Sequence, residues 1–67
     1  MFSDYVVYIR YYYSKGIFGS NQKAETTICV RAESEGGAAE KARRQLEADL
    51  KQKGYRLGNY STNAKKM

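Results

Sequence analysis

The chain has 67 residues, a formal net charge of +5, one cysteine, and neither histidine nor proline. A chain of this length supports one domain, which buries only about 60% of the surface that its unfolded form exposes. An internal disulfide and a histidine-based metal site are both excluded, and a lone cysteine is typical of a reducing compartment. No segment approaches the ~20 apolar residues of a membrane helix, and the N-terminus lacks a signal-peptide pattern. We therefore expect a single soluble cytoplasmic domain without cofactor or metal.

The first predicted element is a strand over residues 4–13, which hold five of the seven tyrosines. Aromatic and β-branched side chains favour strands. Residues 14–22 are rich in turn-forming residues and predict a loop. Residues 23–32 then alternate between apolar and polar side chains, which is the pattern of a half-buried second strand.

A helix is predicted over residues 35–53. Ser34 is a suitable N-cap, because its hydroxyl can accept a hydrogen bond from the first turn. Small and aliphatic residues then recur at helical spacing and form one apolar stripe, comprising Ala39, Ala42, Leu46 and Leu50. Gly54 follows as the left-handed residue that ends the helix.

Residues 55–60 predict a short third strand, whereas residues 61–67 hold little that is apolar and predict a disordered basic tail. The order β-β-α-β gives a small α+β domain over residues 1–60. A right-handed crossover from the second strand places the third strand beside the first. We expect a three-stranded antiparallel sheet of order 2-1-3, with the helix packed on one face.

The other face of this sheet is left without a covering element. If Val7 and Ile9 point toward the helix, strict alternation turns a set of tyrosines and arginines outward. This predicted outward face comprises Val6, Tyr8, Arg10 and Tyr12 of the first strand, Thr27, Cys29 and Arg31 of the second, and Arg56 and Tyr60 of the third. Tyr and Arg are enriched at the energetic centres of protein interfaces. The same residues also bind single-stranded nucleic acid, by stacking on bases and contacting phosphates. Cross-strand Tyr–Arg pairs can equally serve stability alone.

Phe18 lies between glycines in the predicted hairpin loop. Two interpretations stay open for this residue. Its side chain could enter a pocket of a partner, or it could fold back over the end of the core.

Catalysis has little support in this sequence. Histidine, the usual base near neutral pH, is lacking, and the carboxylates fall mainly on the helix, where they match basic residues at i,i+4 spacing, as in Glu40–Arg44 and Glu47–Lys51. Phosphate-binding glycine motifs are lacking as well. We expect a protein that is not an enzyme.

The uneven distribution of charge bears on the choice of partner. Residues 33–53 are balanced, so that the positive surplus belongs to the strands and the C-terminal residues. In size and architecture the chain is similar to small phage-encoded host-takeover or anti-defence proteins, including anti-CRISPR inhibitors, which commonly occlude the surface of a partner. That similarity covers general form and no motif, so it implies no functional residues. The leading hypothesis is a binding protein that docks on another protein, followed by a small nucleic-acid-binding domain and then by a homodimer with this face as its seam.

Overall fold

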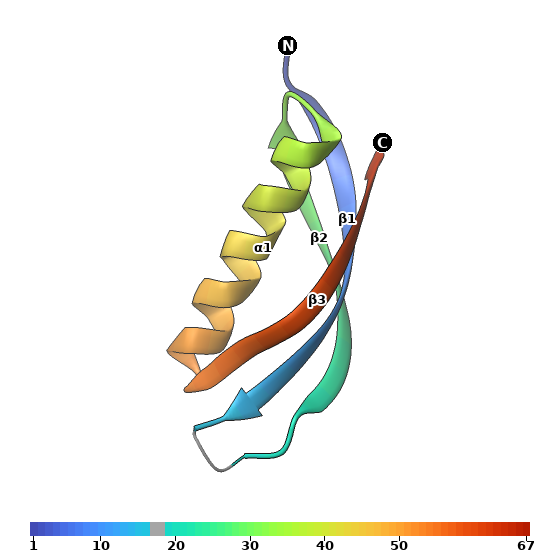
Figure 1. Ribbon diagram of the computed structural model, residues 1–67. Helices are drawn as coiled ribbons and strands as arrows, with labels where there is room; N and C mark the ends of the chain where they lie inside the picture. Colours follow the sequence, from blue (N-terminus) through green and yellow to red (C-terminus); the bar gives the residue numbers. More distant parts are fainter. Residues whose placement is uncertain (17–18) are drawn as a thin grey trace.

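The computed structural model describes residues 1–16 and 19–67. Strand β1 (Ser3–Lys15) pairs antiparallel with β2 (Gln22–Ala32) on one side and with β3 (Tyr55–Lys66) on the other. Helix α1 (Glu35–Gln52) lies along one face of this β2-β1-β3 sheet (Figure 1). The predicted α+β fold, with its strand order and its central tyrosine-rich strand, is confirmed.

The core lies between β1 and α1. Tyr5, Val7 and Ile9 are buried on the strand, where alternate residues share a face. The buried residues of the helix are Ala38, Ala42, Leu46 and Leu50. They follow a single row at i,i+4 spacing, so Ala38 is fully buried and the predicted Ala39 is only half-buried. Two alanines with no exposed surface let the helix backbone approach the sheet closely.

The helix ends where its capping residues predict. The Ser34 hydroxyl oxygen accepts a 3.1 Å hydrogen bond from the backbone N–H of Gly37. At the other end, Gly54 has φ 85°, the left-handed conformation that glycine adopts without strain.

The tyrosines of β1 are divided between the two faces of the sheet. On the helix side, the rings of Tyr11 and Tyr13 have centroids 5.8 Å apart, and Tyr13 meets Tyr55 edge-on at 5.1 Å. This cluster continues the core beyond Ile9 toward the end of β1. Burial raises the pKa of the Tyr11 hydroxyl, and the neighbouring Tyr13 adds to the effect.

The prediction that residues 61–67 form a disordered tail is wrong, because β3 continues to Lys66. Its second half pairs with the first half of β1, with Lys66 opposite Tyr5, and the backbone N–H of Met67 donates to the Asp4 carbonyl oxygen at 2.9 Å. Pairing satisfies the backbone groups of β1 along this edge, which otherwise would lack partners beside the core. Ala64, opposite Val7, packs on the core and is the small apolar signal of this half-strand.

A β-bulge interrupts the pairing of β1 with β3. Tyr13 lies opposite Leu57 but Tyr11 lies opposite Tyr60, so one extra residue is inserted on β3 around Gly58. The backbones approach closely there, since a Cβ added to Gly58 would lie 3.2 Å from the carbonyl oxygen of Tyr12. Every residue of β3 after the bulge therefore points to the face opposite to that expected from uninterrupted alternation.

Candidate binding surface

The face of the sheet turned away from α1 carries a band of polar and aromatic side chains. We call this band the open face. The pairing registers assign to it Asp4, Val6, Tyr8, Arg10 and Tyr12 of β1, Lys23, Glu25, Thr27, Cys29 and Arg31 of β2, and Arg56, Ser61, Asn63 and Lys65 of β3.

All of the predicted outward residues except Tyr60 lie on the open face. Tyr8 and Tyr12 are exposed along β1, Arg10 lies between them, Arg31 is on β2, and Arg56 is opposite Ser14 near the bulge.

Tyr60 is not on the open face, and its predicted position there is wrong. The bulge turns it to the helix side, opposite Tyr11. Its side chain is nevertheless 47% exposed, because it lies on an edge strand. Phe18 lies outside the described residues.

Two arginines of the open face are paired with carboxylates on the neighbouring strand. Arg10 Nε lies 2.9 Å from Glu25 Oε1, and Arg31 Nε lies 3.7 Å from Asp4 Oδ1. In both pairs the residues are directly opposite in the β1–β2 register. Side chains as exposed as these contribute only about 0–1 kcal/mol of stability per pair. The main effect of these two ion pairs is that the open face carries both positive and negative charges.

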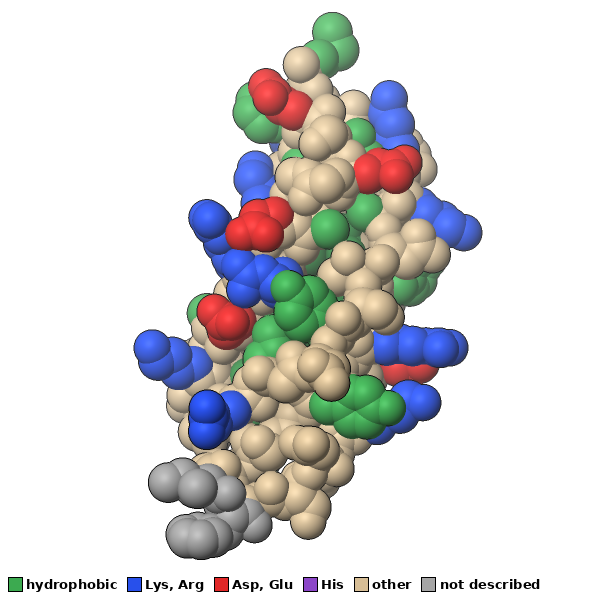
Figure 2. Space-filling view, viewed as in Figure 1, with side chains coloured by type: hydrophobic (Ala, Val, Ile, Leu, Met, Phe, Trp, Pro, Cys, Tyr) green, Lys and Arg blue, Asp and Glu red, His purple; other side chains and the backbone are tan. Residues whose placement is uncertain are grey.

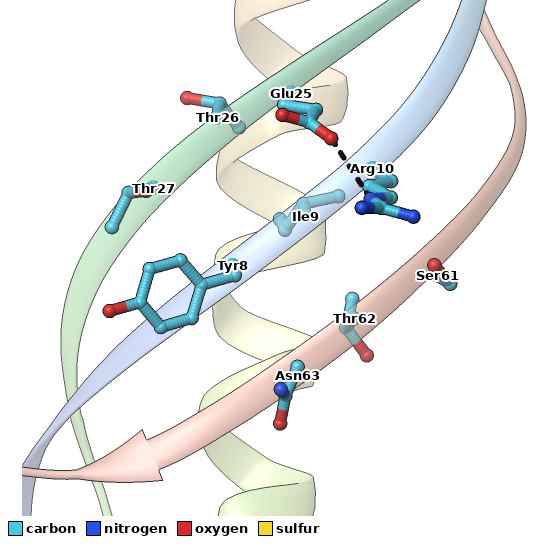
Figure 3. A pocket seen from close by; sticks show the side chains of 9 residues that line it. All are labelled: Tyr8, Ile9, Arg10, Glu25, Thr26, Thr27, Ser61, Thr62 and Asn63. Atoms are coloured by element: carbon cyan, nitrogen blue, oxygen red, sulfur yellow. Dashed lines mark ion pairs between the residues drawn. The ribbon is translucent and has the colours of Figure 1, made fainter.

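One hollow of the open face lies over the middle of β1. It has a volume of about 650 Å³. Tyr8, Arg10 and Glu25 are the long side chains at this place, and the shorter side chains of Thr27, Ser61 and Asn63 flank them (Figure 3). The hollow exists because β3 offers only small polar groups beside the large residues of β1.

Parts of this surface could not be found from the sequence. Ser61 and Asn63 fall in the segment predicted to be disordered, and they reach the open face only because β3 extends and bulges. Glu25 belongs to the alternating second strand, but its pairing with Arg10 depends on the strand register.

The outer surface of α1 is a different kind of surface, because its charges satisfy one another. Glu40 Oε1 accepts from Arg43 at 3.0 Å and from Arg44 at 3.1 Å, the second being the predicted i,i+4 pair. Arg43 also donates to Glu47 at 3.3 Å, so Glu47 has a partner other than the predicted Lys51. The hydrogen bond from Arg43 is the main reason that the pKa of Glu40 is lowered, with Arg44 adding to it. On the side of the molecule seen in Figure 2, acidic and basic side chains are interspersed.

Among residues 1–16 and 19–67, no cluster of histidine, cysteine, aspartate or glutamate has the arrangement of a metal site. The described helix α1 is not long and apolar enough to span a bilayer. Comparisons of the chain with protein-family models, with curated proteins and with solved structures find no match.

Proposed function

We propose that this protein is a non-catalytic binding protein that docks on another protein through the open face. The observation that carries the proposal is Tyr8, which is 48% exposed beside the Arg10–Glu25 ion pair at the rim of the hollow. An exposed aromatic ring next to a paired arginine supplies both the apolar area and the oriented polar groups of an interface hot spot. The small polar residues around the hollow leave room for a side chain of the partner.

The ion pairs favour a protein over a nucleic acid as the partner. Phosphates would meet Glu25 and Asp4 at the two arginines that are otherwise suited to bind them. A protein surface carries both signs of charge and can complement such a pattern.

A single-stranded nucleic acid is the second candidate. It is favoured by the cations Lys23, Arg56 and Lys65, which give the open face a positive surplus, and by Tyr8 and Tyr12, on which bases could stack. Binding of this kind weakens steeply with salt, with a log–log slope of about −0.7 per phosphate neutralised on single strands.

A domain of this size can act by occupying a surface of its partner. Similarity in size and architecture to small phage-encoded host-takeover and anti-defence inhibitors supports this mode. We propose an inhibitor of that type, working in the cytoplasm without a cofactor.

Fluorescence-anisotropy titration against mixed RNA and DNA oligonucleotides tests the class of partner. We expect no salt-sensitive binding in the micromolar range. Capture on the immobilised protein from an extract of the source cells should in parallel give a partner that survives nuclease treatment. Micromolar, salt-sensitive oligonucleotide binding that is lost in Tyr8→Ala would replace the protein partner with a nucleic acid.

A further inference from the structure

The two edges of the sheet differ in how well they are protected against pairing with another strand. An edge strand presents unpaired backbone N–H and C=O groups, and bulges and lysines are the common protections. The β3 edge has both, since it is bulged near Gly58 and its charged residues are Arg56, Lys65 and Lys66. No acidic residue lies on β3, so a second β3 would be repelled.

The β2 edge has neither protection over its middle. Its pairing with β1 runs without a register shift, and residues 26–30 read Thr-Thr-Ile-Cys-Val, an uncharged and largely β-branched run. Glu25 and Arg31, of opposite sign, flank this run at equal distances from Ile28.

We propose that two copies of this chain pair antiparallel along β2, across a two-fold axis at Ile28. The three strands of each copy then form one continuous six-stranded sheet. A two-fold axis perpendicular to the sheet keeps the two helices on the same side. The two open faces also become neighbours on the opposite side, so the dimer doubles the surface available to a partner.

The charges along β2 select the register. With Ile28 on the axis, Glu25 lies opposite the partner's Arg31, and the same contact occurs twice by symmetry. Lys23 then lies opposite the partner's Glu33, just beyond the end of the strand. Opposite charges that face each other across an antiparallel pair are stabilising.

Neighbouring registers lack this complementarity. An axis at Thr27 places Lys23 opposite the partner's Arg31, which pairs like charges. An axis at Cys29 brings Glu25 opposite the partner's Glu33, which again pairs like charges. Registers that pair an odd-numbered residue of one β2 with an even-numbered residue of the other are not available. They would place the two helices on opposite sides of the sheet and break the two-fold symmetry.

The ion pairs within each copy lengthen the row of alternating charges that crosses the seam between the two copies. Arg10 is bound to Glu25, and Arg31 is bound to Asp4, each directly across from the other on adjacent strands. Pairing at Ile28 therefore joins them into a row that crosses four strands. It runs from Arg10 through Glu25 to the partner's Arg31 and the partner's Asp4, with the sign of the charge alternating at every step.

The helix side of β2 also leaves apolar surface partly exposed in the single chain. Helix α1 packs more over β3 than over β2, and Ile28 and Val30 are only half-buried in the single chain. In the proposed register Ile28 meets the partner's Ile28, and Val30 meets the partner's Thr26. Burial of these side chains at the seam adds the hydrophobic contribution that an ion-pair row by itself does not supply.

The register predicts a specific cross-link. Thr27 lies opposite the partner's Cys29, and opposite residues in an antiparallel pair have the Cα separation that a disulfide needs. The Thr27→Cys variant, which keeps the native Cys29, should give a covalent dimer under mild oxidation on a non-reducing gel. Thr27→Cys combined with Cys29→Ser removes one of the two sulfurs and should stay uncross-linked. Glu25→Cys is the register control, because it would meet the partner's Cys29 only with the axis at Thr27.

Light scattering coupled to size exclusion tests the association of the wild-type chain. We expect a mass that rises with concentration to about twice the 7.7 kDa of one chain. The Ile28→Lys variant should remain monomeric, with circular dichroism showing that it is folded. A monomeric mass at every concentration, or a cross-link that forms in Glu25→Cys and not in Thr27→Cys, would overturn the proposed dimer.

Discussion

Tyrosine and valine occur on both faces of β1, but only the face that meets α1 is buried. Tyr5, Val7 and Ile9 point to α1 and are buried, whereas Tyr8 and Arg10, on the same strand, remain exposed. The presence of tyrosine or valine does not separate the two faces, because both residue types occur on each face. The layer that packs above each set decides between them. An aromatic residue in a strand is therefore assigned to the core or to a binding surface by its parity, and one bulge is enough to reverse that assignment.

The largest effect is expected from shortening β3. A chain that ends at Tyr60 loses the partner of the first half of β1 and uncovers the core beside Val7, where Ala64 now packs. A small domain has little stability to spare, so we expect loss of the cooperative thermal transition in circular dichroism. The double variant Lys65→Ser, Lys66→Ser keeps the backbone pairing and is the control. An unchanged melting temperature in the truncated chain would mean that this segment does not cover the core.

Leu46→Ala tests the helix side of the comparison. Leu46 is 6% exposed and lies in the middle of the buried row of α1. Its truncation should lower the free energy of unfolding by about 2–5 kcal/mol, measured by urea denaturation. Gln45→Ala, one residue away on the exposed surface, should change it by no more than about 0.5 kcal/mol. Equal effects of the two substitutions would show that the helix faces the sheet differently.

Two adjacent valines give a matched test of parity within one strand. Val7 has no exposed surface, whereas Val6 is half-buried on the open face. Removal of two methyl groups from the core should cost about 2 kcal/mol in Val7→Ala, from the transfer of the methyls and the cavity that they leave. Val6→Ala should cost clearly less in the same denaturation experiment. The reverse order would exchange the covered and open faces.

The smallest effect concerns Tyr11, on the covered face. Burial raises its pKa, so the folded state holds the phenolic proton more tightly than the unfolded state does. The stabilisation from this residue is complete below the unfolded pKa of about 10 and is lost as the pH rises through the folded value. Tyr11→Phe should therefore flatten the fall in stability on the alkaline side, measured as melting temperature against pH. A slope as steep as that of the wild type would exclude Tyr11 as its source.

Much of the fold follows from local patterns. The change from period two to period 3.6 after Ala32 predicted the order of elements, and Ser34 and Gly54 gave the ends of the helix. These features depend on residues close together in the sequence. The pairing of β3 with β1 depends instead on residues far apart in the sequence. The second half of β3 is polar, and without its pairing to β1 it has the sequence pattern of a disordered tail.

The residues of the candidate site were likewise predictable only where their position follows from alternation along one strand. Alternation placed Tyr8, Arg10 and Tyr12 of β1 and Arg31 of β2 on one face, because neither strand is interrupted by a bulge in the β1–β2 pairing. Tyr60 was misplaced because an extra residue near Gly58 reverses the parity of β3. Strict alternation takes no account of the bulge that an isolated glycine in a strand often marks. The carboxylates that pair with Arg10 and Arg31 required the strand register, which the sequence alone did not provide.

Two tyrosines of nearly equal exposure on opposite faces give the most direct test of the open face as a binding surface. Tyr8 is 48% exposed on the open face and Tyr60 is 47% exposed on the helix side. Immobilised wild type, Tyr8→Ala and Tyr60→Ala are used to capture proteins from nuclease-treated extract of the source cells, and the bound protein is quantified by mass spectrometry. A protein held by the wild type should be retained by Tyr60→Ala and lost from Tyr8→Ala, which should weaken binding by about 2 kcal/mol or more. Retention by Tyr8→Ala together with loss from Tyr60→Ala would contradict the assignment and move the binding surface to the helix side of the sheet.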